Sequence, residues 1–131
     1  MGASLPLVRT AAGRAYLAFC GDDERELLLQ MLREREDDEG AFARDQRTVR
    51  KHLDAIRERG FAVNEGNDWI GRGRYGAVAV PIRSADGVAA CLDMVFSKRA
   101  IKVEEAAKKY APELLAAAAT IETQTQGAKS H

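Results

Sequence analysis

Two neighbouring runs of apolar residues near the middle of the chain constrain its fold more than any other feature. Residues 77–83 and 88–97 alternate between bulky and small side chains, and the short segment 84–87 joins them. This arrangement predicts a β-hairpin, in which successive side chains point to opposite faces. One face would carry Val78, Val80, Ile82, Leu92, Met94 and Phe96, and the other would carry Ala77, Ala79, Pro81, Ala89, Cys91, Asp93 and Val95. The sequence therefore predicts an antiparallel sheet with a bulky core face and a small face that either contacts a helix closely or forms the floor of a cavity.

Asp93 is the carboxylate that interrupts the small face of this hairpin. Burying an unpaired carboxylate costs several kcal/mol, so a buried Asp93 would need a partner, water or a ligand. We favour a cavity with Asp93 on its floor. The alternative is an edge strand that presents Asp93 to solvent, and the sequence leaves this alternative open.

Small residues open the first predicted helix. Thr10 can cap this helix, and Gly21 is expected to stop it. Because Ala11, Ala12 and Gly13 are small, a ligand can approach the backbone N–H groups of the first turn, and such groups bind anions. A carboxylate could therefore dock there, although tight packing on a sheet also requires small residues. The apolar stripe of the helix is expected to carry Ala12, Ala15, Tyr16 and Phe19.

Two further helices are predicted before the hairpin. The first starts at a capping-box-like pair, Asp23 and Glu26, and the charged residues 33–40 after it are expected to form a loop or an exposed helix end. The second begins near Asp45 and ends before Gly60, which suits a left-handed C-cap. Their buried stripes are expected to be Leu28, Met31 and Leu32 in the first helix and Val49, Leu53 and Ile56 in the second.

The remaining segments are a short strand, a glycine-rich segment and a final helix. Residues 61–63 are expected to form the strand, and residues 64–76, which include Trp69, a flap. The final helix covers residues 103–121, with a kink or break at Pro112, and residues 123–131 are expected to be a frayed tail. Its apolar stripe would carry Ala107, Tyr110, Leu114, Ala117, Ala118 and Ile121.

The composition limits the class of protein. A chain of 131 residues with 20 basic and 20 acidic side chains is expected to be a single domain, residues 1–131, whose net charge attracts neither DNA nor an anionic membrane. The sequence shows no phosphate-binding glycine pattern, no metal-ligand spacing and no membrane-spanning segment. We therefore expect no cofactor, no metal, no membrane contact and a cytoplasmic location. Cys20 and Cys91 lie far apart among apolar neighbours, which predicts buried, reduced thiols.

Several motifs, spread over nearly the whole chain, resemble one known family. They are Leu5-Pro6-Leu7, residues 10–15 and 17–18, residues 56–62, residues 77–82, the turn at residues 84–87, residues 110–112 and residues 116–121. Together they resemble the effector-binding domain of IclR-type bacterial transcriptional regulators. In that family a helix-turn-helix domain binds the operator. A C-terminal GAF- or profilin-like domain, of α/β (α+β) structure with helices packed on an antiparallel sheet, binds a small organic acid or aromatic effector.

The resemblance implies a function and a set of site residues. The chain is expected to be a truncated effector-binding domain, because it lacks the DNA-binding domain and the strands that precede the Leu-Pro motif in the family. Its expected partners are a small organic acid and copies of itself in a homodimer or tetramer, with DNA bound only through the absent helix-turn-helix. The effector contacts would fall on Leu5, Ala11, Ala12, Glu65, Asn67, Tyr75, Ala77, Cys91, Asp93 and Val95.

Asp93 departs from the family, which usually has Ser or Asn at that position. A negative charge there repels a carboxylate effector unless Asp93 is protonated or binds a hydroxyl or amine of the effector. The strand sequences around it resemble the branch that regulates aromatic acid catabolism, which favours a hydroxylated aromatic acid. The competing hypothesis is a small enzyme of the hydrolase or isomerase type that uses Asp93 with Cys91 or His52. The sequence supplies no base and orienting residue at usable spacing for it.

Overall fold

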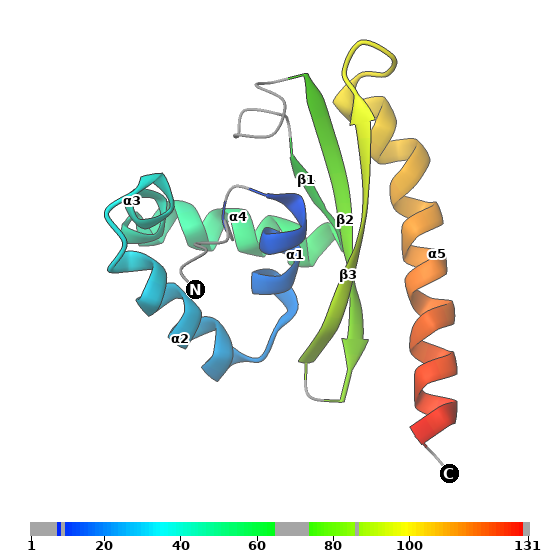
Figure 1. The fold of residues 1–131 in the computed structure, drawn as a ribbon, viewed down its shortest axis with the longest axis horizontal. Coiled ribbons are helices and arrows are strands. Elements are labelled where there is room, and N and C mark those ends of the chain that lie inside the picture. The colour runs from blue at the N-terminus through cyan, green and yellow to red at the C-terminus, as the bar shows by residue number, and fades with distance from the viewer. Residues whose placement is uncertain (1–7, 9, 65–73, 86, 130–131) are drawn as a thin grey trace.

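A three-stranded antiparallel sheet separates one long helix from a group of four shorter ones (Figure 1). The computed structural model describes residues 8, 10–64, 74–85 and 87–129. The elements in chain order are α1 (Ala11–Phe19), α2 (Asp22–Arg33), α3 (Asp38–Arg44), α4 (Gln46–Arg59), β1 (Ala62–Asn64), β2 (Tyr75–Ser84), β3 (Gly87–Ser97) and α5 (Val103–Lys129). Over the described residues the strand order is β1-β2-β3, so β2 is central and β3 is an edge strand. This confirms the predicted class, in which helices pack on an antiparallel sheet.

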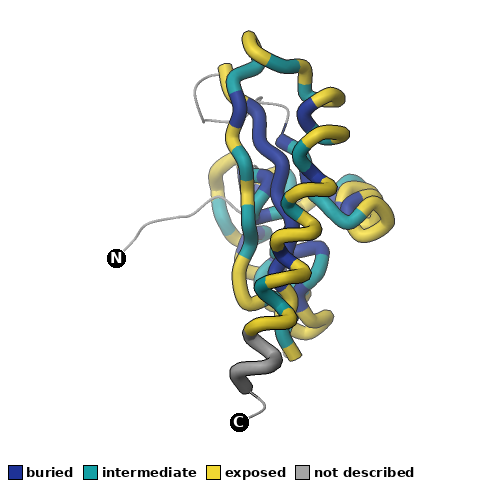
Figure 2. The backbone as a smooth tube through the Cα atoms, turned by 90° about the vertical axis from the view of Figure 1, so that its right-hand side faces the viewer, coloured by how far each residue is buried: buried dark blue, intermediate teal, exposed yellow. Residues whose placement is uncertain are grey.

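The β2–β3 hairpin has the two faces that the alternation predicts. Val78 and Phe96 are buried in a core that also contains buried residues of α5. Ala77 and Ala79 are buried on the opposite face, in the core that the shorter helices share. β2 is therefore buried along most of its length, whereas β3 is only partly covered (Figure 2). The central strand is enclosed because small side chains let α1 approach one face while bulky side chains fill the other.

α5 packs along the bulky face of the sheet. It buries Ala106, Ala111 and Ala118 and half-buries Ala107, Tyr110, Leu114 and Ile121, as the predicted stripe requires except that Ala117 is exposed. The helix passes through Pro112 without a break and continues to Lys129. Of the kink or break expected at Pro112 the break is therefore wrong, and so is the frayed tail over residues 123–129. Pro112 is exposed, and water can therefore bond to the carbonyl of Lys108, which lacks its helical N–H partner. None of the described helices is both long and apolar enough to cross a membrane.

α1 begins as predicted and ends differently. The Thr10 hydroxyl accepts a hydrogen bond from the Gly13 N–H at 3.0 Å and caps the helix. Gly21 does not stop α1 in a left-handed conformation, because the helix ends at Phe19 and Gly21, with φ −62°, is the N-cap of α2. Only Ala15 of the predicted apolar stripe is buried, because the sheet and α4 together cover a different set of α1 residues. The other buried residues of α1 are Ala11, Gly13, Leu17 and Ala18.

α2 starts two residues earlier than the predicted capping box requires. Its first residue is Asp22, its N-cap is Gly21 and no side chain caps it, so the box of Asp23 and Glu26 is wrong. The acidic residues of this first turn are instead favoured by the positive end of the helix dipole. The buried side also differs from the prediction, because Leu29 and Leu32 are buried and Met31 is exposed.

The charged residues after α2 form the expected loop only over residues 34–37. From Asp38 the expectation is wrong, because these residues begin α3, a short helix whose N-cap Asp37 accepts a hydrogen bond from the Gly40 N–H at 3.2 Å. Glu39 in its first turn is fully buried, although its sequence neighbours are charged. The following helix, α4, confirms the prediction: Asp45 is its N-cap and Gly60, with φ 91°, its left-handed C-cap.

Candidate functional site

The first turn of α1 lies against the small face of the sheet. Ala11 belongs to the same buried cluster as Ala77 and Ala79 of β2. The Cys91 thiol of β3 donates a hydrogen bond to the Ala12 carbonyl oxygen at 3.5 Å, although the two residues are 79 positions apart. Where α1 covers it, the small face is therefore a close helix contact. The structure brings Ala11, Ala12, Ala77 and Cys91 together, as the predicted site requires.

Beyond α1 the small face is open along the edge strand. Asp93 pairs with Ala79 and Val95 pairs with Ala77, but Asp93 is exposed and 54% of Val95 is accessible to solvent. The expectation that Asp93 is buried on a cavity floor is wrong for this arrangement, because β3 is an edge strand and solvent hydrates the carboxylate there. Tyr75, at the start of β2, is 43% exposed. We call the exposed residues Tyr75, Asp93 and Val95 the outer rim of the candidate site.

Three of the predicted effector contacts lie outside the described residues: Leu5, Glu65 and Asn67, as does Trp69 of the expected flap. The chain next to these segments is described and is well anchored. Val8 is 3% exposed, and Asn64, which pairs with Ala77 at the end of β1, is 5% exposed. The positions from which both segments depart are thus fixed beside the small face.

Two side chains that the sequence analysis did not assign to the site provide this anchoring. Both carboxylate oxygens of Glu39 accept a hydrogen bond from the Val8 N–H, at 3.1 and 3.2 Å. The Arg14 guanidinium, on α1, donates to the Val8 carbonyl at 3.4 Å and to the Val63 carbonyl. Arg14 therefore links Val8, before α1, to strand β1. No local pattern singles out either residue, because Glu39 stands in a run of charged residues and the carbonyl groups that Arg14 binds belong to other segments.

The thiol of Cys91 is suited to donate a hydrogen bond and not to attack a substrate. Burial, and secondarily the charge of Asp93, raises the pKa of Cys91 to about 11, so the thiol keeps its proton at neutral pH. His52 is exposed on α4, and its ring meets Phe42 edge-on at 5.4 Å. Partial desolvation of the imidazole ring lowers the pKa of His52, and the nearby cations Arg14, Lys51 and Arg59 lower it further. The predicted enzyme alternative thus finds no activated nucleophile in Cys91.

Metal ligands do not gather within the described part of the chain, where no group of three or more His, Cys, Asp or Glu residues could hold an ion. Cys20 and Cys91 are both free thiols, with Cys20 buried and Cys91 half-buried. The described residues of the site thus offer hydrogen bonding, the dipole at the start of α1 and the charge of Asp93.

Comparison with known proteins gives a consistent result. A family model described as bacterial transcriptional regulator IclR C-terminal matches residues 1–123. An IclR-family transcriptional regulator from Brucella abortus is 26% identical with a TM-score of 0.73, and the match covers 95% of this chain and 46% of that one. The C-terminal domain of the E. coli regulator KdgR is 25% identical with a TM-score of 0.70, over 95% of this chain and 73% of that one.

The same fold occurs in the inducer-binding domain of the Acinetobacter transcription factor PobR, whose structure is a double mutant in complex with 3-hydroxybenzoic acid. That domain is 19% identical with a TM-score of 0.67, over 93% of this chain and 70% of that one. The chain spans about half the length of the Brucella regulator. The proteins of this family and these neighbours are transcriptional regulators and not enzymes, which removes the hydrolase or isomerase alternative.

Proposed function

The chain belongs to the family of bacterial transcriptional regulator IclR C-terminal domains, and on this premise we propose that it senses a small organic acid and thereby controls a regulator of transcription. The observation that carries the proposal is the contact between the first turn of α1 and the small face of the β2–β3 hairpin. Ala11 and Ala12 have side chains too small to block this helix start, and aligned backbone N–H groups there attract a carboxylate.

The outer rim supports a hydroxylated aromatic acid as the effector. Asp93 lies two residues beyond Cys91 on the same face of β3, so a ligand that starts at α1 and extends along the strand meets this carboxylate. A carboxylate repels another anion but accepts a charge-assisted hydrogen bond from a hydroxyl group. The complex of the PobR inducer-binding domain with 3-hydroxybenzoic acid suggests the first ligand to try.

Calorimetry with 3-hydroxybenzoate and with benzoate tests the proposal. Ala12→Leu places bulk at the start of α1 and should abolish binding of both acids at this site. Ala116→Leu makes the same change at an exposed position of α5 and should leave binding intact. Absence from the unmodified protein of any saturable binding step that Ala12→Leu removes would contradict an aromatic acid effector at α1.

A second substitution tests the hydroxyl end of the proposed ligand independently of its carboxylate end. Asp93→Ala should weaken the binding of 3-hydroxybenzoate by about 1.5–3 kcal/mol, the value of a hydrogen bond to a charged group. The binding of benzoate should be unchanged or stronger. Equal losses for both acids would show that Asp93 does not bind the hydroxyl group. The helix-start part of the proposal would survive that result, because it depends on Ala12 alone.

Self-association is part of the proposed function. β3 has eleven residues and, among the described strands, pairs only with β2, so one edge of it is available to another strand. Val95 on this strand and Leu115 on α5 are exposed apolar side chains that a partner could cover. We therefore expect at least a homodimer, and a monomer in sedimentation equilibrium at all concentrations would contradict it.

A further inference from the structure

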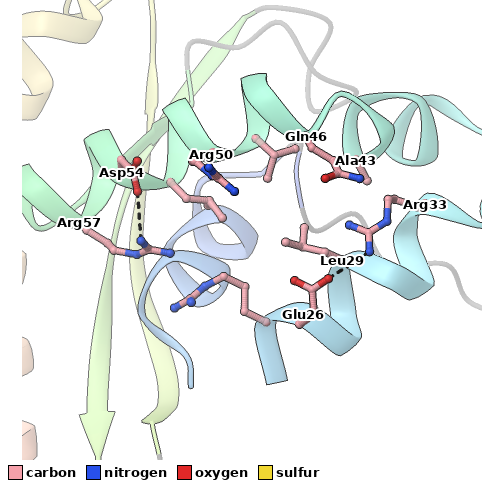
Figure 3. A pocket seen from close by; sticks show the side chains of 11 residues that line it. Glu26, Leu29, Arg33, Ala43, Gln46, Arg50, Asp54 and Arg57 are labelled. Atoms are coloured by element: carbon pink, nitrogen blue, oxygen red, sulfur yellow. Dashed lines mark hydrogen bonds and ion pairs between the residues drawn. The ribbon is translucent and has the colours of Figure 1, made fainter. Parts of the chain in front are cut away.

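A cleft of about 240 Å³ lies between α2 and α4, on the side of the protein that carries the shorter helices (Figure 3). Its floor is apolar, because Leu29 of α2 and Val49 and Leu53 of α4 reach it from the main core. Its walls carry four arginines and two carboxylates. None of its lining residues belongs to the site at the start of α1, so any ligand of this cleft binds separately.

Two of the arginines are occupied by the end of α1. Arg25 donates from Nε to the Leu17 carbonyl at 2.6 Å and from Nη2 to the Ala18 and Cys20 carbonyls at 3.1 and 2.6 Å. Arg57 donates from Nε to the same Ala18 carbonyl at 2.8 Å. These guanidinium groups satisfy the carbonyls left without partners at the end of the helix, which is a structural role.

Ion pairs at the two ends of the cleft neutralise further charge. Arg33 binds Glu26 at 3.2 Å at one end, and Arg57 binds Asp54 at 3.1 Å at the other. Arg25 binds Asp22, which does not line the cleft, at 2.7 Å. Arg50 lies between the pairs at the two ends (Figure 3). Arg50 is exposed, and it forms no hydrogen bond or ion pair with the described residues. The positive charge left without compensation therefore sits at Arg50, above the apolar floor.

This combination selects one kind of ligand. A guanidinium group binds a carboxylate through two parallel hydrogen bonds, and an apolar floor favours a body without charge. The cleft is smaller than the roughly 300–1,000 Å³ of sites for drug-sized ligands, so only a compact molecule fits. We propose that the cleft between α2 and α4 is a second ligand site, which binds a small monocarboxylic acid with a compact apolar body. Arg50 holds its carboxylate, and Leu29, Val49 and Leu53 contact its body.

The test uses benzoate as the probe and the Ala12→Leu protein as the background, so that the site at α1 is closed. Backbone amide signals of Val49 and Leu53 should shift saturably on titration with benzoate. Arg50→Gln in this background should weaken the binding at least tenfold. Arg47→Gln removes the same charge from an exposed position of α4 outside the cleft and should leave the binding unchanged.

Two further probes identify the chemistry that is recognised. Benzamide, which has the same ring without the charge, should not saturate the site, and inorganic phosphate should not compete with benzoate at equal concentration. Equal binding by the Arg50→Gln and Arg47→Gln proteins would overturn the proposal, as would competition by phosphate. Failure of benzoate to bind at α1 in the unmodified protein would refute only the effector site, because the signals at Val49 and Leu53 report the cleft.

Discussion

Glu39 offers the most direct test of what holds the chain at the candidate site. The side chain is fully buried, and both of its oxygens accept the Val8 N–H, 31 positions away. A hydrogen bond to a charged group contributes roughly 1.5–3 kcal/mol, and a buried donor without a partner costs a similar amount. Glu39→Gln keeps the shape of the side chain and one oxygen that can accept from the Val8 N–H, but this oxygen is uncharged, so the bond falls to the roughly 0.5–1.5 kcal/mol of a neutral hydrogen bond.

We therefore expect Glu39→Gln to lower the free energy of unfolding by about 1–1.5 kcal/mol, the difference between a charged and a neutral hydrogen bond. In a domain of this size each kcal/mol corresponds to roughly 3–5 °C in melting temperature, which thermal unfolding followed by circular dichroism resolves. Glu36→Gln is the matched control, because Glu36 is exposed in the same charged segment and such surface changes usually stay within about 0.5 kcal/mol. Equal melting temperatures for the two variants would refute the reasoning that the Glu39–Val8 contact stabilises the fold.

Three other predictions follow from single contacts. Gly40→Ala should destabilise the protein by roughly 1–3 kcal/mol in urea unfolding, because the added Cβ would lie 1.9 Å from the Arg35 carbonyl oxygen. Gly21→Ala is the control and should lower the free energy of unfolding much less, because its Cβ would meet nothing within 4 Å. Equal losses for the two variants would contradict the tight contact at Gly40. In the folded protein the pKa of Cys91 is raised from 9.0 to about 11, so the protonated thiol contributes to stability below pH 9 and this contribution is lost as the pH rises toward 11. The Cys91→Ala protein should therefore lose less stability between pH 9 and 11 than the unmodified protein. The same pH profile of stability for both proteins would contradict this prediction. With 20 basic and 20 acidic residues, this chain alone should show no sequence-selective DNA binding in a mobility-shift assay at physiological salt, and a selective shift would refute that expectation.

The sequence by itself determined the elements that depend on local chemistry. The alternation in β2 and β3 predicts the hairpin and its two faces, since side-chain direction in a strand follows parity alone. The caps of α4, Asp45 and Gly60, are also readable, because each acts on residues next to it in the chain. Thr10 at the start of α1 is a third case. The motifs that resemble IclR-type regulators add the family, which the comparison over residues 1–123 confirms.

The tertiary structure alone decided which of these surfaces are covered. Parity places Asp93 on the small face, but its exposure depends on β3 being the edge strand, which no local pattern specifies. α3 and the burial of Glu39 were missed because the group that satisfies the carboxylate, the Val8 N–H, lies far away in sequence. The contact of Cys91 with Ala12 likewise joins residues 79 positions apart in the sequence. Such contacts arise only when helices and sheet pack together, since burial of a polar group is favourable only where its partner arrives at the same time.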